Sequence, residues 1–216
     1  DYNEATKVGR KRGEKNTHEA ECLPFFNLKE GNPQVEYKPF VLFVGRIEKQ
    51  KGLMSLVKAF QNTDYNLKII GFSNDGYEDE LKAYLNGKRH HIEFLGKMNF
   101  EQIVPYLKSC LCTVVPSEWY DNFPNVILES FAYKKAVVAT NFGSLPELVR
   151  NGETGLTFNY QDVEDFRSKI AYFFAHPTEA KAMGENAFQN VQTCFSPAEH
   201  YNRLMKLFND ITGKQK

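Results

Sequence analysis

Short apolar runs alternate with helical patterns along most of this chain, from Pro39 onward. The apolar runs occupy residues 40–45, 67–71, 92–96, 111–115 and 136–139, with a weaker sixth run at 155–158. After the first run, apolar residues recur three or four positions apart, as on one helix face: Leu53, Leu56, Val57 and Phe60. Strands that alternate with helices pair in parallel. The sequence therefore predicts an α/β fold with a Rossmann-like, doubly wound parallel sheet of about six strands.

Further helices are expected between and after these strands. They fall at 77–86, 100–109, 124–133, 145–150, 161–174, 177–193 and 197–212. Pro105 lies inside one of them, where its missing N–H predicts either a kink or a later helix start. Residues 1 to about 20 are polar and are expected to form a linker, and the apolar run at 22–26 is expected to form an edge strand.

The charge balance and the residue spacing exclude several classes of protein. The 27 acidic and 27 basic residues cancel, so no overall field favours nucleic acid. No apolar run approaches the length of a membrane span, and the chain has neither an initiator Met nor a signal-peptide pattern. We expect a cytoplasmic piece of a longer protein, with any membrane contact peripheral at the inner face.

The cysteines and histidines show no metal-binding spacing. The four cysteines form no CxxC pair, and the five histidines form no HExxH motif. We therefore expect Cys110 and Cys112, which flank a strand start, to be reduced core residues. No metal cofactor is expected.

The stretch 116–130 combines an apolar strand end, a polar aromatic loop and a helix start. Pro124 suits the first turn of a helix, so the amides of Asn125, Val126 and Ile127 are expected to be free donors at the positive helix end. Such a helix end is a site for an anion, for example a phosphate.

Two acids bracket this expected anion site. Asp121 lies in the loop, and Glu129 lies about one turn into the helix, from where its side chain leans back toward the loop. A nucleotide sugar, which carries phosphates and hydroxyls, would suit this arrangement. An acid near a helix start also offsets the helix dipole, and Asp-Asn is common in turns, so the stretch alone leaves both interpretations open.

The loops that follow the other strands support the nucleotide-sugar interpretation. In a doubly wound sheet, ligands bind beyond the carboxyl ends of the strands. Arg46 and Lys51 follow the first strand, near a helix start where the dipole disfavours cations, so a bound anion would explain them; a solvated basic loop is the alternative. Glycine-containing loops follow the second, third and fifth strands, at 71–76, 96–99 and 141–147.

These motifs resemble the C-terminal, donor-binding half of a GT-B glycosyltransferase of the large retaining group called family 4. The resemblance covers roughly residue 23 to the end of the chain. It rests on the order and spacing of Gly45-Arg46…Lys51-Gly52, Phe94-Leu95-Gly96, Pro116-Ser117, the acids Asp121 and Glu129 eight positions apart, Gly143-Ser144-Leu145-Pro146-Glu147 and Asn151-Gly152-Glu153-Thr154-Gly155.

The resemblance implies a role for each matched residue. Arg46 and Lys51 would bind the donor diphosphate and neutralise the leaving group, Asp121 would contact the sugar, and Glu129 would bind the ribose hydroxyls. The backbone near Lys97 and Met98 would read the base. The implied catalytic residues are Arg46, Lys51 and Asp121, and the implied donor-binding residues are Gly45, Lys97, Met98, Asn122, Phe123, Pro124, Asn125, Val126, Ile127 and Glu129.

Three positions depart from the family pattern. Asp121 stands where the family usually has Glu, one methylene longer, which puts its contact with the sugar in doubt. Pro124 replaces a common Gly, as in members with an Asn-Phe-Pro variant, and Ala136 replaces a frequent Pro.

By this resemblance, the chain would transfer a hexose with retention from a UDP- or GDP-linked donor to a saccharide or lipid-linked acceptor, in cell-surface polysaccharide synthesis. The implied division is a linker or tail at 1–36, a nucleotide-sugar-binding domain at 37–194, and a C-terminal helix at 195–216 that crosses back to a missing N-terminal domain. Without that domain, inefficient transfer is expected. Two alternatives stay open: a non-catalytic nucleotide-binding module of the same fold, and a nucleotide-sugar epimerase.

Overall fold

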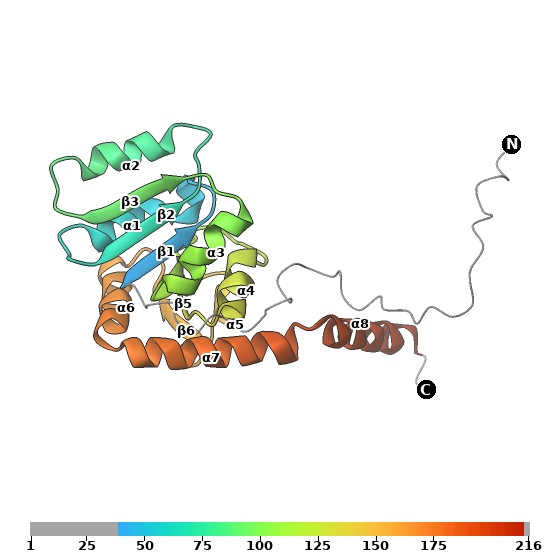
Figure 1. Ribbon diagram of the computed structural model, residues 1–216. Coiled ribbons are helices and arrows are strands. Elements are labelled where there is room, and N and C mark those ends of the chain that lie inside the picture. Colours follow the sequence, from blue (N-terminus) through green and yellow to red (C-terminus); the bar gives the residue numbers. More distant parts are fainter. Residues whose placement is uncertain (1–38, 214–216) are drawn as a thin grey trace, which may run out of the picture.

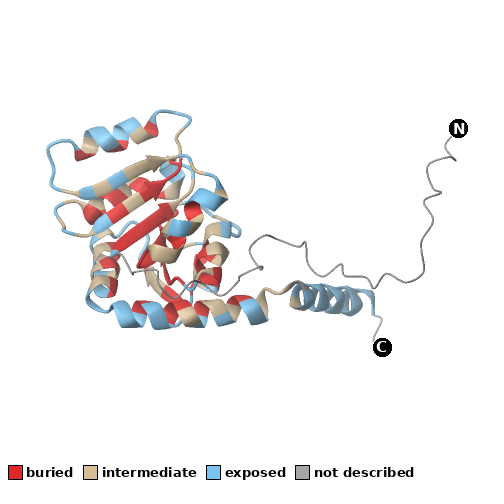
Figure 2. Ribbon diagram, viewed as in Figure 1, coloured by how far each residue is buried: buried red, intermediate tan, exposed pale blue. Residues whose placement is uncertain are grey.

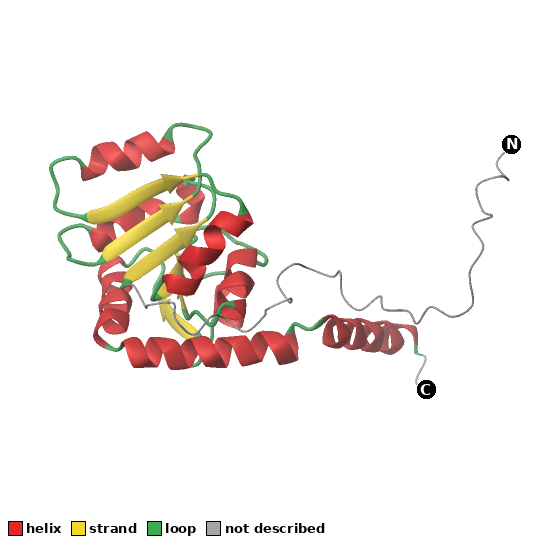
Figure 3. Ribbon diagram, viewed as in Figure 1, coloured by secondary structure: helices red, strands yellow, loops and turns green. Residues whose placement is uncertain are grey.

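The computed structural model describes residues 39–213, and six parallel strands form its central sheet (Figures 1 and 3). The strands are β1 (Phe40–Val44), β2 (Asn66–Ile70), β3 (His91–Gly96), β4 (Cys112–Val115), β5 (Val137–Thr140) and β6 (Gly155–Phe158). Their order is β3-β2-β1-β4-β5-β6, and every neighbouring pair is parallel. The predicted doubly wound α/β sheet is therefore confirmed. The tail at 1–36 and the edge strand predicted at 22–26 lie outside the described residues.

Each predicted helix is present, with small shifts at the ends. The helices are α1 (Leu53–Phe60), α2 (Tyr77–Leu85), α3 (Phe100–Ser109), α4 (Asn125–Ala132), α5 (Leu145–Leu148), α6 (Val163–Ala175), α7 (Pro177–Cys194) and α8 (Pro197–Thr212), with a 3₁₀ turn, η1 (Lys49–Lys51), before α1. The later start considered for α3 is wrong. A reciprocal capping box between Asn99 and Gln102 fixes its first residue at Phe100, and the helix runs through Pro105.

Alternating side chains of the strands bury two faces of the sheet. In β1, Val41 and Phe43 pack with α1, α2 and α6, whereas Phe40 and Leu42 pack with α3 on the other face. A third cluster joins β4 and β5 to α4, α5 and α7. Figure 2 shows the buried residues concentrated in the strands and in the inner faces of these helices. Strands buried on both faces explain the nearly continuous apolar runs in the sequence.

Two of the cysteines belong to this interior. Cys110 and Cys112 are buried and free, as predicted, and burial raises the pKa of the Cys110 thiol to about 12. The C-terminal helix differs from the others: α8 extends away from the sheet, and its side chains from residue 200 onward are exposed (Figures 1 and 2). Within residues 39–213, no helix combines the length and the apolar character that a membrane span needs.

The strand order reverses between β1 and β4, and in doubly wound sheets ligands bind in the crevice beyond the carboxyl ends of the strands at such a reversal. We call the side of the sheet where the strands end the carboxyl edge. The chain leaves β1 toward one side of the sheet and β4 toward the other, so the loops after these two strands diverge around this point. The sequence of the loops at the carboxyl edge therefore decides what the fold can bind.

Candidate functional site

The loops after β1 and β4 are locked together at the carboxyl edge. The Glu118 amide donates to the Gln50 carbonyl at 2.8 Å, and the Ser55 hydroxyl donates to the Glu118 carboxylate at 2.6 Å. Gly52, with φ +70°, lies so close to the other loop that a Cβ there would be 1.8 Å from the Pro116 carbonyl oxygen. This contact requires glycine and fixes η1 against the loop after β4.

Lys51 and Asp121 meet across this junction. The Lys51 ammonium lies 2.7 and 2.8 Å from the two Asp121 carboxylate oxygens, and the two side chains are 25% and 17% exposed. The structure thus brings together two of the three predicted catalytic residues, but as an ion pair. An ammonium group has three donors, so Lys51 keeps one for a further partner.

Arg46, the third predicted catalytic residue, has a side chain at the protein surface. Its side chain is 57% exposed and pairs with Glu48 at 2.6 Å, so it forms no contact with the Lys51–Asp121 pair. Gly45, just before it, donates its amide to the Ile70 carbonyl at 3.0 Å and holds the end of β1 beside β2. The sequence brings the two cations to one loop, and in the structure each pairs with a different acid, Arg46 with Glu48 and Lys51 with Asp121.

The N-terminus of α4 offers two free amides rather than three. Pro124 is the N-cap, and no side chain caps the helix. Within residues 39–213, the amides of Asn125 and Val126 have no hydrogen-bond partner, whereas the Ile127 amide donates to the Pro124 carbonyl at 3.0 Å. The prediction of a free Ile127 amide is therefore wrong, because a tight first turn uses that donor. The remaining pair still lies at the positive helix end.

Glu129 lies one turn into α4 with its carboxyl group partly buried. Burial raises the pKa of this carboxyl group, and among the described residues its oxygens accept no hydrogen bond and form no ion pair. The neighbouring Tyr133 also has a raised pKa, first through burial and then through the charge of Glu129. A partly buried carboxylate without a partner is available to hydroxyl donors of a ligand.

The remaining predicted residues also follow strand ends, those of β3 and β4. Lys97 follows β3 and places its ammonium 4.8 Å from the centre of the Phe72 ring, while Met98 packs against the α3 side of the core. Asn122 is exposed beside Asp121, and the exposed Phe123 ring lies 5.7 Å from Phe195.

One positioning residue was missed by the sequence analysis. The Ser144 hydroxyl donates to the carbonyls of Asp121 and Asn122, at 2.5 and 2.9 Å. It fixes the loop that carries the acid. The Gly143-Ser144 motif marked this position in the sequence, but a serine that bonds only backbone carbonyls has no distinctive spacing. Within the described part of the chain, no three His, Cys, Asp or Glu residues gather to hold a metal ion.

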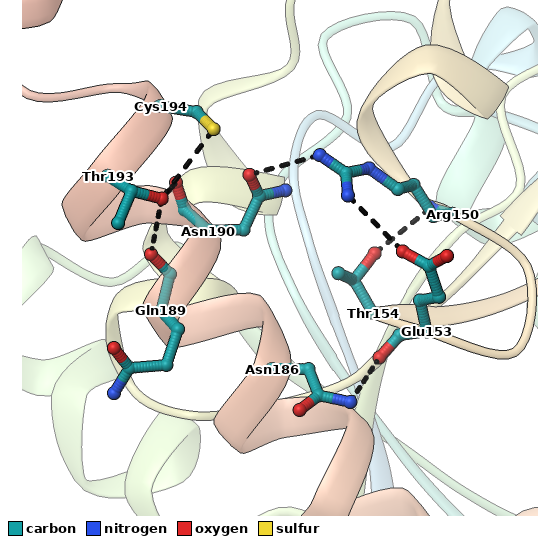
Figure 4. A pocket seen from close by; sticks show the side chains of 8 residues that line it. All are labelled: Arg150, Glu153, Thr154, Asn186, Gln189, Asn190, Thr193 and Cys194. Atoms are coloured by element: carbon teal, nitrogen blue, oxygen red, sulfur yellow. Dashed lines mark hydrogen bonds and ion pairs between the residues drawn. The ribbon is translucent and has the colours of Figure 1, made fainter.

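A separate hollow of about 360 Å³ lies away from this crevice, against α7 (Figure 4). It adjoins the loop that precedes β6. Arg150 joins Glu153 at 3.2 Å and Asn190 at 3.4 Å, and the Asn186 amide donates to the Glu153 carbonyl at 3.2 Å. These groups satisfy one another and attach the loop to α7, which indicates a structural role for the Asn151–Gly155 motif.

Comparison with known proteins gives a consistent family. The family model described as glycosyl transferases group 1 matches residues 25–190. An uncharacterized glycosyltransferase of Methanocaldococcus jannaschii is 34% identical over 68% of this chain and 41% of its own length. The lipopolysaccharide core biosynthesis mannosyltransferase LpcC of Rhizobium leguminosarum is 30% identical over 78% of this chain and 50% of its own length. The chain thus spans half or less of these relatives.

A solved structure shares the fold. The Anabaena protein HepE, in complex with UDP and glucose, aligns with a TM-score of 0.70 at 21% identity and covers 79% of this chain and 48% of its own. At this identity the likeness concerns the fold alone: the same arrangement of parallel strands and helices.

Proposed function

This chain belongs to the glycosyl transferases group 1 family, and from that membership we propose that it is the donor-binding half of a retaining glycosyltransferase. It would transfer a sugar from a nucleoside-diphosphate sugar to a saccharide or lipid-linked acceptor. The single observation that carries the proposal is the Lys51–Asp121 pair at the strand-order reversal, because it joins a cation and an acid where the fold forms its crevice.

In the proposed mechanism, the donor diphosphate displaces Asp121 from Lys51. The Lys51 ammonium and the free amides of Asn125 and Val126 then stabilise the negative charge that grows as the glycosidic bond breaks. Arg46, at the protein surface, turns from Glu48 to the same diphosphate. These groups supply the positive charge, and we propose that transfer needs no metal ion.

The two acids bind the neutral parts of the donor. Asp121, released from Lys51, accepts hydrogen bonds from the sugar hydroxyls, and Glu129 accepts them from the ribose. The base lies at the carboxyl edge of β3, against the backbone of Lys97 and Met98. The carboxyl edge then holds base, diphosphate and sugar in the order β3, β1, β4.

The comparisons support a choice of substrates. HepE was crystallised with UDP and glucose, and LpcC is named as a mannosyltransferase of lipopolysaccharide core biosynthesis. We therefore propose a UDP- or GDP-linked hexose as donor and a cell-surface saccharide or glycolipid as acceptor. The enzyme would act in the cytoplasm or at the inner face of the membrane. An N-terminal half of the same protein would bind the acceptor and receive α8.

Calorimetric titration with UDP, GDP and ADP, free and sugar-linked, tests the proposal. We expect one nucleotide to bind selectively, and Lys51→Ala to weaken it at least tenfold, as for a lost charged hydrogen bond. Asp121→Asn should bind the free nucleotide as well as or better than wild type, because the Asp121 carboxylate no longer competes for Lys51. The gain in affinity that the linked sugar provides should be smaller in this variant than in wild type. Lys82→Ala, which removes a similar ion pair with Glu78 on α2, is the matched control.

Two results would contradict the proposal. One is equal nucleotide affinity in wild type and Lys51→Ala. The other is the absence of binding by both this chain and a longer chain that includes the N-terminal half. Selective nucleotide binding with no transfer by the longer chain would favour the non-catalytic alternative, which the shorter acid at position 121 suggests.

A further inference from the structure

Exposed aromatic side chains gather at the carboxyl edge beyond β4, β5 and β6. Tyr120 follows β4, Phe142 follows β5 and Tyr160 follows β6. The ring centres of Tyr120 and Phe142 lie 4.6 Å apart, and those of Phe142 and Tyr160 lie 4.7 Å apart with ring planes 20° from parallel. We call these three rings the aromatic platform. Trp119, beside Tyr120, is 59% exposed.

Backbone contacts hold the platform in place. The Asn141 amide donates to the Phe158 carbonyl at 2.6 Å, which joins the ends of β5 and β6. Gly143, with φ +60°, turns the chain so closely beneath Tyr120 that a Cβ would lie 3.4 Å from its ring. The Ser144 hydroxyl connects the same turn to the carbonyl of Asp121. A platform fixed in this way requires little ordering when a ligand binds.

The platform rings do not belong to the three core clusters of the described residues. Tyr120 and Tyr160 are 69% and 39% exposed, so most of the apolar area of Tyr120 faces water. Large aromatic rings grouped on a surface mark an interaction site more often than isolated apolar residues do. The grouping on three separate loops, with two short ring distances, shows that the fold assembles this surface.

The chemistry of the surface favours a sugar ring. The negative face of an aromatic ring attracts partly positive C–H groups, and one face of a pyranose presents such groups. The side chains next in sequence to the platform include exposed amides, those of Asn141 and Gln161, which can bond the equatorial hydroxyls of a sugar. An aliphatic chain has no polar group that could form hydrogen bonds with these amides.

We propose that the aromatic platform is a stacking subsite for a pyranose ring of the saccharide acceptor. This proposal rests on the proposed function, which sets the order of base, diphosphate and sugar along the carboxyl edge. With the base at β3, the diphosphate at β1 and the sugar at Asp121 beyond β4, the strand order puts β5 and β6 next in line. The acceptor must approach the transferred sugar, and the platform begins one residue from Asp121. The transferred sugar would thus lie between the Lys51–Asp121 pair and the platform.

The tryptophan content of the chain provides a direct test. Trp119 is its single tryptophan and borders the platform. The titrants are methyl α-mannopyranoside, methyl α-glucopyranoside, mannobiose and maltose, each with and without UDP or GDP. We expect a saturable change in tryptophan emission, with affinities on the order of millimolar, as for small neutral ligands. Saturation-transfer NMR should show the strongest contacts at the C–H groups of one pyranose face.

Substitution of an outer ring separates stacking from simple apolar contact, because the central ring, Phe142, is covered by its two neighbours. Tyr160→Leu keeps an apolar side chain but removes the exposed π face, and should weaken pyranoside binding about five- to tenfold. Tyr160→Phe should restore it. Tyr201→Leu, which removes an exposed aromatic ring of α8, should have no effect.

The outcomes distinguish this subsite from the proposed function. The subsite is overturned if wild type shows no saturable response to any pyranoside. It is also overturned if Tyr160→Leu binds as well as wild type, which would identify an apolar docking face for another part of the protein. Nucleotide binding, measured on the same samples, should not change in Tyr160→Leu. Binding of pyranosides without any binding of nucleotide, in this chain and in a longer chain that includes the N-terminal half, would contradict the proposed function and leave the subsite standing.

Discussion

Glu129 has a carboxyl group that the described protein does not satisfy. It is partly buried, it has no hydrogen-bond partner among residues 39–213, and burial raises its pKa. Its oxygens are not fully buried, so in the free protein they keep some contact with solvent. A ribose hydroxyl would supply the missing donor. The carboxyl group then reduces the stability of the free protein and contributes to affinity, a common compromise at binding sites.

We predict that Glu129→Gln stabilises the free protein at neutral pH. The folded pKa of Glu129 lies above the unfolded one, so the folded state binds more protons between the two values. The free energy of unfolding therefore falls as pH rises through that interval. The variant does not undergo this loss of stability, so it should be more stable than wild type at about pH 7, with the difference vanishing near about pH 4. Urea unfolding at both pH values measures it.

The same substitution should weaken nucleotide binding about tenfold, because a hydrogen bond to a charged acceptor is lost. Glu101→Gln, which changes an exposed acid of α3, is the control and should leave affinity unchanged. Wild-type affinity in Glu129→Gln would exclude a contact between this carboxylate and the ligand.

Gly52 determines how closely two elements of the site approach each other. It ends η1 and caps α1 with φ +70°, and a Cβ there would be 1.8 Å from the Pro116 carbonyl oxygen. Gly76 caps α2 with φ +79° but has no atom within 4 Å of the same position. The two glycines share the backbone conformation and differ in the close contact, so they form a natural pair for substitution.

We predict that Gly52→Ala destabilises the protein much more than Gly76→Ala. Gly76→Ala should cost about 1 kcal/mol, the strain of a left-handed alanine. Gly52→Ala adds a clash with backbone and should cost at least about 2 kcal/mol more. It should also weaken nucleotide binding, since Lys51 would move away from the loop of Asp121. Urea unfolding and calorimetry measure both effects; equal destabilisation would show that the loop adapts.

The elements of this fold were predictable because each has a strong local signal. β1 is buried on both faces and therefore reads as an uninterrupted apolar run, and α1 shows the spacing of one buried helix face. One difference is at α5, which ends at Leu148 rather than residue 150. Val149 is already extended there, and the Arg150 amide bonds the Thr154 hydroxyl. That contact depends on a loop conformation that the sequence pattern does not encode.

The site was predictable in position but not in its pairings. Strand ends located Lys51 and Asp121 at one edge, because parallel strands end together. Their ion pair depends on how two loops pack together, through Gly52 and the Gln50 carbonyl. The spacing of apolar residues in the sequence does not predict such packing between loops. The Ile127 amide was predicted to be free because helix starts usually leave their first three amides without partners. Here the Pro124 carbonyl closes the first turn.

At the scale of the whole molecule, α8 presents an apolar surface with no counterpart in the described residues. The helix is capped by Ser196 and extends away from the sheet (Figure 1). Its exposed large apolar residues are Tyr201, Leu204, Met205, Leu207, Phe208 and Ile211. An apolar face of this kind marks an interaction site. Under the proposed function, its partner is the N-terminal half of the same protein.

We predict that deletion of residues 197–216 leaves the stability of the sheet domain nearly unchanged. Because the large apolar side chains of α8 are exposed, their removal should change the free energy of unfolding by less than about 1 kcal/mol. Val191→Ala, in the buried face of α7, is the contrast and should cost about 1 to 3 kcal/mol. In a longer chain that includes the N-terminal half, the same deletion should instead destabilise the protein strongly, because it removes buried apolar area. Urea unfolding of both chains tests this prediction. A large loss of stability in the short chain would show that α8 packs against another part of this same chain.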